Sequence, residues 1–495
     1  MLYRSEFFLQ NPFYERDCKG NTFYSNDIMS AVLFFINKNY EPAFYLCAIM
    51  QLKNIHFIAI GGAAMHNLAL DLAAAGLKVT GSDDEIYEPA LSNLRNAGLL
   101  PDKTGWFPER ITDNLDAVIL GMHARSDNPE LLRAVELGIR IFSYPEFVYL
   151  RSKDKKRVVI AGSHGKTTTT AMVMHVLQKS GIETDYLLGA KIDGFERMVK
   201  ISVAPLIIIE GDEYLSSPID RKPKIHHYKP HITVLTGIAW DHINVFPTFE
   251  NYISQFEIYL ATIEEGGVLI YNQEDHSIKQ ILSGVRKDIR LVTYIPLERQ
   301  GKKSIIYNER IHDISVIGKH NLSNMSAAKE VCAQLGISDE NFFKYIADFK
   351  GASKRLQIIN QSEHRTVFLD FAHAPSKVTA TCTAVKEWYG EQKLLAVLEL
   401  HTFSSLNKEF IPQYKDSLAS ADKAVVFFNA HTLEMKKMPE LNETFLVNAF
   451  AHPDCIVLKN EQQLLEYLSS EKFYDYNILL MSSGNFNQMD LNKIR

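Results

Sequence analysis

Short runs of aliphatic residues alternate along this chain with glycine turns and with longer segments whose apolar residues recur at helical spacing. From residue 50 onward the order is a strand-like run (IHFIAIGG), a helix-like segment (AAMHNLALDLAAAG) and a second strand-like run (LKVTGSD). Further strand-like runs occur at DAVILG and IRIFS. Strands that alternate with helices in this way predict a parallel, doubly wound α/β sheet.

The same alternation recurs twice more, so the chain is predicted to hold three α/β units. We place them at residues 50–153, 154–352 and 353–495. Residues 1–49 are aromatic-rich and only weakly periodic, and Met50 directly precedes the first clear strand. We interpret residues 1–49 as an extra N-terminal segment that need not belong to the native fold. The alternative is an additional helix and strand packed against the first unit.

One stretch of the second unit, RVVIAGSHGKTTTTAMVMHVL, combines a β-branched strand, a glycine turn, a Lys-Thr pair and an apolar helix. Such a junction can cradle nucleotide phosphates, because the backbone N–H groups of the turn and the positive end of the helix both attract anions. Lys166 would reach the β and γ phosphate oxygens, and the Thr167 hydroxyl would bind Mg²⁺. Ile160 stands where the common phosphate loop has its outer glycine, so a shorter loop is expected; the alternative is an ordinary strand–turn–helix junction. The predicted nucleotide-binding positions of this loop are Gly162, Ser163, His164, Gly165, Lys166, Thr167 and Thr168.

Composition narrows the classes of partner. The 495 residues are 46% hydrophobic and 23% charged, with a formal net charge of −6, so no bulk attraction to nucleic acid or to an anionic membrane is expected. The apolar runs fall short of the ~20 residues that cross a bilayer. The 5 cysteines form no C-x-x-C pair and indicate a reducing compartment. We therefore predict a cytoplasmic protein with no nucleic-acid partner and no membrane insertion.

The first unit carries a candidate site for a nucleotide with a diphosphate. Gly61 and Gly62 follow the first strand, where such folds bind a diphosphate, and Asp83 ends the next strand, where a carboxylate for a ribose is expected. We take these three residues as candidate substrate contacts. The sequence GGAAMH departs from the G-x-G-x-x-G fingerprint. Two alternatives therefore stay open, a tight packing turn and a nicotinamide-dependent oxidoreductase.

Carboxylates at the end of a core strand are candidates for holding Mg²⁺ in a phosphate-loop protein. Glu210 ends the run APLIIIE and is predicted to be a metal ligand, with Asp212 and Glu213 behind it. Asp241 and His242 follow the next apolar run and form a candidate second metal or phosphate site. An Asp-His pair of this kind is more often a helix cap or a surface pair, so the structural interpretation stays open.

Polar residues also mark a later helix and the strand ends of the third unit. In GKHNLSNMSAAKEV, Asn321 and Asn324 share one side of the predicted helix. Asp370, His373 and His401 follow strand-like runs of the third unit. Because ligands of open α/β sheets bind at the carboxyl ends of the strands, His373 and His401 are candidate substrate contacts.

Taken in order, these motifs resemble the Mur ligase family of ATP-dependent amide synthetases of peptidoglycan. GSHGKTTT is similar to the family's short GTxGKT loop, HNLSNMSAA to its HNxxNxxAA motif, and DFAHAP to its DYxHxP element. The resemblance covers nearly all of residues 50–495. It implies the three-domain Mur ligase architecture: a Rossmann-like UDP-binding domain, a central ATPase domain with the phosphate loop, and a C-terminal Rossmann-like domain that binds an amino acid or peptide.

The resemblance also implies a reaction and roles for the matching residues. ATP would convert a carboxylate into an acyl phosphate, which an incoming amine attacks to give an amide. A nucleotide-gated binding protein without catalysis is the further alternative. In the implied assignment, Lys166 holds the phosphates and Arg355 meets the γ-phosphate. The implied Mg²⁺ ligands are Thr167, Glu210 and His242. Asn321 contacts adenine within a nucleotide-binding set that includes Asn324, and Asp370 binds the ATP ribose.

The implied substrates are UDP-N-acetylmuramate and an amine. The segment NYISQFEIYL lacks the modified lysine that some family members carry, which suits the branch acting directly on UDP-N-acetylmuramate. Within that branch, the long segment EGDEYLSSPIDRKPKIHHYKP is similar to members that add the tripeptide L-alanyl-γ-D-glutamyl-meso-diaminopimelate in peptidoglycan recycling. His401, Thr402, Phe403, Ser404 and Ser405 replace an arginine-bearing element of the members that add L-alanine.

These two departures favour the tripeptide over L-alanine as the amine substrate. The tripeptide members also carry an arginine in the stretch that matches residues 401–405, so recognition of the peptide carboxylates stays open. The third residue of the peptide and the oligomeric state are open as well.

Overall fold

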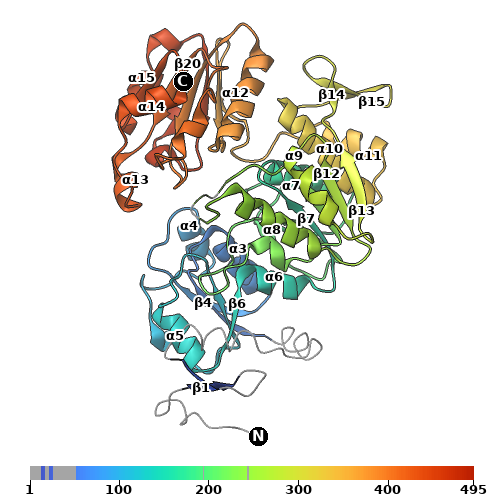
Figure 1. The fold of residues 1–495 in the computed structure, drawn as a ribbon, viewed down its shortest axis with the longest axis vertical. Coiled ribbons are helices and arrows are strands. Elements are labelled where there is room, and N and C mark those ends of the chain that lie inside the picture. Colours follow the sequence, from blue (N-terminus) through green and yellow to red (C-terminus); the bar gives the residue numbers. More distant parts are fainter. Residues whose placement is uncertain are drawn as a thin grey trace. The chain divides into compact units, whose positions relative to one another are not determined.

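The computed structural model describes residues 52–192, 194–241, 243 and 245–494, together with two short antiparallel strands, β1 (Phe13–Arg16) and β2 (Thr22–Ser25). The interpretation of residues 1–49 therefore lies outside the described residues, apart from these two strands. The chain divides into two compact units (Figure 1). The first comprises Met1–Lys153 with Leu215–Lys222, and the second comprises Asp154–Tyr214 with Pro223–Arg495.

A parallel sheet forms the centre of the first unit. Its strands, in order across the sheet, are β4 (Lys78–Ser82), β3 (Asn54–Ile58), β5 (Ala117–Leu120) and β6 (Arg140–Ser143). Its helical elements are α3 (Ala63–Ala74), α4 (Ala90–Asn96), η2 (Pro108–Arg110), α5 (Pro129–Glu136) and α6 (Tyr144–Ser152). Asn128 is the N-cap of α5, and its side chain accepts hydrogen bonds from the N–H groups of Glu130 and Leu131. All neighbouring strands are parallel, so their carboxyl ends share one edge, where the Gly61–Gly62 turn follows β3.

The segment Leu215–Lys222 belongs to the first unit although its neighbours in sequence belong to the second. Ile219 packs into the apolar cluster of β5 and α5. Asp220 accepts a hydrogen bond from the Ser143 hydroxyl at 3.2 Å. The long segment singled out in the sequence therefore supplies part of the first unit.

A larger sheet, parallel except at one end, organises the first part of the second unit. Its strands, in order, are β13 (Arg290–Tyr294), β12 (Val268–Asn272), β11 (Ile232–Leu235), β7 (Lys156–Ala161), β10 (Leu206–Glu210), β8 (Asp185–Leu187) and the antiparallel β9 (Val199–Lys200). Its helical elements are α7 (Lys166–Lys179), η3 (Lys224–His227), α8 (Phe249–Ala261), α9 (His276–Ile281), η4 (Leu282–Gly284), α10 (Lys319–Gln334) and α11 (Asp339–Ile346). A small antiparallel sheet adjoins them, formed by β14 (Glu298–Arg299), β15 (Ser304–Tyr307) and β16 (Arg310–Asp313).

Helices cover both faces of this sheet. Val158 and Ile160 of β7 point into one apolar cluster, which also contains the inner faces of α7, α10 and α11. On the opposite face, the Thr233 hydroxyl of β11 hydrogen-bonds the Tyr259 hydroxyl of α8 at 2.5 Å. Burying each large aliphatic side chain in such a layer contributes roughly 1.5–3 kcal/mol. The continuous apolar run of β7 is therefore explained by burial on both faces.

A third sheet lies in the C-terminal part of the second unit. Its strands, in order, are the antiparallel β17 (Gln357–Gln361), β18 (Thr366–Asp370), β22 (Tyr476–Met481), β19 (Lys393–Glu399), β20 (Lys423–Phe427) and β21 (Cys455–Leu458). Its helical elements are α12 (Pro375–Tyr389), η5 (Ile411–Tyr414), α13 (Ala430–Met435), α14 (Glu443–Phe450), α15 (Glu461–Leu468), η6 (Glu471–Phe473), η7 (Phe486–Gln488) and η8 (Leu491–Lys493). Helices α12 and α14 pack on one face of the sheet and α15 packs on the other.

The predicted class, α/β with parallel, Rossmann-like sheets, is confirmed by these three sheets. Among the helices that the structure describes, none has the length and apolar character needed to span a bilayer.

Candidate active site

The phosphate loop joins β7 to the first residue of α7 in the second unit. Gly162 and Gly165 both adopt positive φ, at 119° and 75°, where a side chain is strained. A Cβ atom at Gly162 would lie 2.5 Å from Thr236 Oγ1, and one at Gly165 would lie 2.1 Å from Asn324 Oδ1. The loop therefore needs glycine at both positions, and it packs directly against the predicted nucleotide-binding helix α10.

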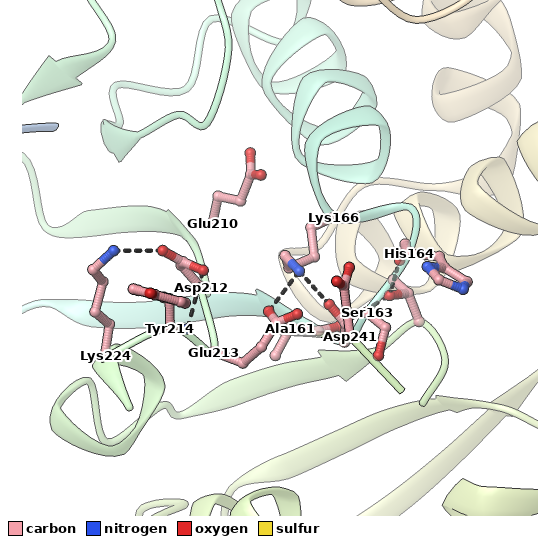
Figure 2. Close-up of polar contacts among 12 residues, drawn as sticks. Ala161, Ser163, His164, Lys166, Glu210, Asp212, Glu213, Tyr214, Lys224 and Asp241 are labelled. Atoms are coloured by element: carbon pink, nitrogen blue, oxygen red, sulfur yellow. Dashed lines mark hydrogen bonds and ion pairs between the residues drawn. The ribbon is translucent and has the colours of Figure 1, made fainter. Parts of the chain in front are cut away.

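Lys166 lies at the start of α7 with its ammonium group directed along the loop. Its Nζ donates to the Gly162 carbonyl at 2.5 Å. It also donates to Glu213 Oε2 at 2.6 Å, and Figure 2 shows the two side chains directed toward each other. Burial disfavours the charged ammonium, but Glu213, Asp212 and Glu210 outweigh this effect and hold the pKa of Lys166 above its usual value. A permanent positive charge therefore stands at the mouth of the loop.

A buried chain of hydrogen bonds holds the partner of this lysine. Glu213 Oε1 accepts from the Tyr252 hydroxyl of α8 at 3.0 Å, and that hydroxyl lies 2.8 Å from Ser163 Oγ. Ser163 Oγ in turn accepts the N–H of Ala239 at 3.0 Å. The sequence prediction missed Tyr252. The sequence shows only a tyrosine within a predicted helix. Its contact with Glu213 depends on how α8 packs, which the sequence alone does not determine.

Two oxygen donors suited to a hard cation lie beside the loop. The Thr167 hydroxyl donates to Glu210 Oε1 at 2.7 Å, and Glu210 Oε2 accepts the N–H of Gly189 at 2.8 Å. Burial raises the pKa of Glu210, against the lowering influence of Thr167 and Lys166. In Figure 2 its carboxylate points away from the Asp212–Lys224 ion pair. The residues present therefore fit a Mg²⁺ ion, which prefers oxygen ligands.

The third predicted metal ligand, His242, lies outside the described residues. Within the described ranges, no group of three or more His, Cys, Asp or Glu side chains is arranged as a metal cluster. The metal assignment therefore stands on Thr167 and Glu210 together with the phosphates that a nucleotide would bring.

One atom of the loop lacks a partner. His164 Nε2 hydrogen-bonds the Ser376 hydroxyl at 2.9 Å, while its buried Nδ1 has no hydrogen-bond partner among the described residues. Burial and the nearby charge of Lys377 lower the pKa of His164 to about 3, so the imidazole is neutral. An unsatisfied polar atom in a glycine loop fits a loop shaped to receive a ligand. The loop therefore fits the phosphates of ATP.

Asn321, the predicted adenine contact, and Asn324, predicted to belong to the same nucleotide-binding set, lie at the start of α10. Asn324 Nδ2 donates to Asn321 Oδ1 at 3.2 Å, and Asn321 Nδ2 donates to the Ile317 carbonyl at 2.8 Å. Asn324 is the member of this pair that adjoins the phosphate loop, through its contact with Gly165. The structure thus brings the loop and the HNLSNMSAA helix together.

Residues of the C-terminal part complete this neighbourhood within the second unit. Arg355 Nη2 donates to the Thr167 hydroxyl at 3.1 Å, and Lys377 Nζ lies 3.2 Å from Asp241 Oδ2. Asp370, the predicted ribose ligand, accepts the N–H groups of Leu356 and Ala372, both at 2.7 Å. It therefore orders the chain on both sides of itself. The sequence prediction missed Lys377, whose partner Asp241 is distant in sequence.

The two predicted histidines of the third sheet occupy different surroundings. His373 Nδ1 lies 2.8 Å from the Phe371 carbonyl, and its own carbonyl accepts the Tyr414 hydroxyl. A Cβ atom at Gly484 would lie 2.8 Å from the His401 ring. The loops that follow β19 and β22 are therefore in close contact at His401.

The candidate diphosphate turn lies in the first unit and is described by itself. Asp83 follows β4, and its Oδ2 accepts the N–H of Gly61 at 2.7 Å. Gly62 precedes α3 and its carbonyl lies 2.9 Å from His66 Nδ1. Burial raises the pKa of Asp83 to about 6, with a further rise from Asp84. The structure thus brings Gly61 and Asp83 together.

The Asp83 carboxyl predicts a pH dependence of stability. Its pKa is raised from 3.8 to about 6. A raised carboxyl pKa gives a stabilising contribution that is complete below the unfolded value and is lost as the pH rises through the folded value. Wild type should therefore lose about 2–3 kcal/mol relative to Asp83→Asn between pH 4 and pH 8. Thermal midpoints of both proteins across this range measure the difference, and parallel curves would refute it.

Gly165→Ala is expected to weaken ATP binding at least about tenfold and to lower the thermal midpoint, because left-handed strain of about 1–2 kcal/mol adds to the overlap with Asn324. Gly181→Ala is the matched control, since Gly181 has φ 69° and nothing within 4 Å of its added Cβ. Titration calorimetry with ATP and thermal unfolding measure both variants. If both variants lost the same ATP affinity and the same thermal stability, backbone strain alone would explain the effect of Gly165→Ala, and the packing against α10 would not.

The site has three features: a glycine loop precedes a helix, a lysine occupies the first helical position, and a carboxylate hydrogen-bonds the next threonine. Together they define a nucleotide-binding α/β protein of the phosphate-loop class. Residues 54–154 match the description "Mur ligase family, catalytic domain", residues 160–332 match "Mur ligase middle domain", and residues 354–484 match "Mur ligase, glutamate ligase domain". The chain belongs to the Mur ligase family, and the resemblance drawn from its motifs is confirmed.

Members of this family are ATP-dependent amide ligases of peptidoglycan synthesis, and this chain is an enzyme of that class. A UDP-N-acetylmuramate–L-alanine ligase from Carboxydothermus hydrogenoformans is 27% identical over 89% of this chain and 96% of its own length. A UDP-N-acetylmuramate–L-alanyl-γ-D-glutamyl-meso-2,6-diaminoheptandioate ligase from Haemophilus influenzae is 28% identical over 75% of this chain and 83% of its own length. Relatives with the first of these names predominate.

The fold is shared with solved Mur ligases. The crystal structure of a murein peptide ligase from Psychrobacter arcticus is 22% identical, covers 89% of this chain and 98% of its own, and gives a TM-score of 0.65.

Proposed function

We propose that this ligase joins the carboxylate of UDP-N-acetylmuramate to the amine of the tripeptide L-alanyl-γ-D-glutamyl-meso-diaminopimelate, with ATP and Mg²⁺, in peptidoglycan recycling. These are small-molecule substrates, and the proposal places the enzyme in the cytoplasm. We assign the UDP-sugar to residues 50–153, ATP to residues 154–352 and the amine substrate to residues 353–495.

The loop His401–Ser405 after β19 bears on how the amine substrate is held. It contains no arginine, and the hydroxyls of Thr402 and Ser405 hydrogen-bond each other at 3.0 Å. Ser405 Oγ accepts the N–H of Thr402 at 2.9 Å, and Thr402 Oγ1 accepts the N–H of Ser405 at 3.0 Å. The loop therefore offers no cation to the substrate, and the carboxylate of the amine substrate is left to other elements.

The observation that carries the tripeptide proposal is the segment Leu215–Lys222. It lies within residues 210–230, the long segment that resembles the tripeptide branch. Its contacts through Ile219 and Asp220 give it an ordered place in the first unit. A segment kept folded in this way is suited to shape a binding surface.

The residues of the second unit suit the activation of a carboxylate. Bound ATP would supply the phosphoryl group, and Thr167, Glu210 and His242 would hold a Mg²⁺ ion, which would neutralise charge on the phosphate oxygens. Lys166 and Arg355 present positive charge where the phosphate loop ends. When phosphates bind, Lys166 can exchange its contact with Glu213 for one with a phosphate oxygen, while the Tyr252 hydroxyl keeps Glu213 hydrogen-bonded. No covalent enzyme nucleophile is required, because the amine itself attacks the activated carboxyl carbon.

L-alanine is the second candidate for the amine substrate. The predominance of relatives named for L-alanine favours it. The two candidates differ in the mass of the product, so one assay separates them.

The test is phosphate release with ATP, Mg²⁺ and UDP-N-acetylmuramate, with either L-alanine or the tripeptide, and mass detection of the product. The proposal predicts a kcat/KM for the tripeptide at least about a hundredfold above that for L-alanine, equivalent to about 2.7 kcal/mol of transition-state discrimination. A preference for L-alanine would overturn the recycling role while leaving the ligase class intact.

A further inference from the structure

Lys436 is a half-buried cation in the C-terminal part of the second unit. It follows α13, which spans Ala430–Met435, and its Nζ lies 4.4 Å from the centre of the Phe403 ring. Three other lysines of this region pair with carboxylates. These ion pairs are Lys386–Asp422, Lys423–Asp454 and Lys459–Glu443. Lys436 has no carboxylate partner among the described residues.

The position of Lys436 is the one at which open α/β sheets bind ligands. Phe403 lies in the loop that follows the carboxyl end of β19, and this loop meets the one that follows β22 at His401 and Gly484. The Lys436 charge also acts on His401, whose pKa is lowered by burial and by Lys436 against the opposing influence of Glu399. Lys436, Phe403 and His401 therefore share one edge of one sheet.

The surroundings of Lys436 suit an anionic group with apolar parts. Lys436 is half-buried, and burial alone lowers its pKa, because a partly desolvated ammonium lacks a compensating charge. Phe403 and Met435 expose 44% and 62% of their surfaces beside it. A bound carboxylate would provide the missing charge, and the two apolar side chains would contact its carbon chain.

Among the described residues of the C-terminal part, no arginine lies where it could pair with a carboxylate bound beside Lys436. Arg355 donates to Thr167 in the phosphate-loop neighbourhood. Arg365 donates to the Phe473 carbonyl, next to the start of β18 and away from its carboxyl end. The loop His401–Ser405 carries none.

We propose that Lys436 binds a carboxylate of the incoming amine substrate. The proposal rests on the proposed function only in requiring an amine substrate that bears a carboxylate. The tripeptide and L-alanine both do. Lys436 is then a specificity residue that acts on substrate affinity.

The test compares Lys436→Gln with Lys437→Gln, in which the neighbouring exposed lysine is changed. Lys436→Gln should raise the KM for the amine substrate on the order of tenfold to a hundredfold, while kcat and the KM values for ATP and UDP-N-acetylmuramate stay within about twofold. Lys437→Gln should match wild type, and Lys436→Arg should recover most of the affinity because it keeps the charge.

A substrate series with single carboxylates converted to carboxamides locates the contact. One carboxamide should raise the KM of wild type as much as the substitution does, and should leave Lys436→Gln unchanged. An unchanged amine KM in Lys436→Gln, or additive effects with every carboxamide, would overturn the proposal. The measurements use whichever amine wild type accepts. Turnover of L-alanine alone would therefore refute the tripeptide role, and the Lys436 comparison would still be decided.

Discussion

Lys166→Ala is expected to lower kcat for ATP-dependent phosphate release by about a thousandfold, because the substitution removes the principal cation at the mouth of the phosphate loop. The ammonium is fixed by the Gly162 carbonyl and by Glu213, so it is positioned before any nucleotide binds. A charge held in place in this way stabilises developing negative charge without reorganisation. Steady-state phosphate release measures the loss of kcat.

The same substitution leaves Glu213 buried without its cation, which would itself lower stability. The double variant Lys166→Ala with Glu213→Gln removes that unpaired charge. It should recover the thermal midpoint of wild type and remain inactive. Activity that returns together with stability would contradict the assignment, because the loss would then come from misfolding and not from the missing ammonium.

Glu210→Gln is expected to lower kcat about a hundredfold at low Mg²⁺ concentration and to shift the Mg²⁺ dependence of the reaction to higher concentration. The substitution keeps the size of the side chain but removes the negative charge beside the Thr167 hydroxyl, and a neutral amide is a much weaker ligand for a hard cation. Phosphate release at a series of Mg²⁺ concentrations measures the shift.

Asp212→Asn is the matched control for Glu210→Gln. Asp212 lies two residues along the same segment, but it pairs with Lys224 at 2.5 Å and is partly exposed. Asp212→Asn should shift the Mg²⁺ concentration that the reaction needs by less than about threefold, because partly exposed ion pairs contribute little energy. An equal shift in both variants would mean that overall negative charge near the loop matters, and not a specific ligand at Glu210.

The order of elements and the phosphate loop were predictable because their causes are local. The β-branched run before Gly162 and the apolar spacing after Lys166 lie within one continuous stretch. Glu210 was predictable for a similar reason, since it ends an apolar strand. Such features need no knowledge of which strands are neighbours.

The hydrogen-bond chain around Lys166 could not be predicted in the same way. It links Glu213, Tyr252 and Ser163, and these residues meet only because α8 covers the face of the sheet opposite to α7. The contact between Asn324 and the loop likewise depends on the packing of α10 beside α7. Contacts of this kind are fixed by strand order and helix packing, which residue spacing alone does not determine.

Asp370 illustrates how a strand-end carboxylate can serve its own loop. The resemblance implies a contact with the ATP ribose, which stays a prediction. In the structure both carboxylate oxygens already accept backbone N–H groups, from Leu356 and Ala372. A carboxylate that follows a strand often satisfies the turn after it, and this local use carries no sequence signal distinct from ligand binding.

The central claim is that this site activates a carboxylate by phosphoryl transfer from ATP. The most direct test of this claim follows the oxygen atoms of that carboxylate. UDP-N-acetylmuramate labelled with heavy oxygen in its carboxylate is turned over with ATP, Mg²⁺ and the tripeptide, and the released phosphate is analysed by mass. The account predicts one labelled oxygen in the phosphate for each amide formed, because the carboxylate oxygen leaves with the phosphoryl group. Amide formation with unlabelled phosphate would contradict it.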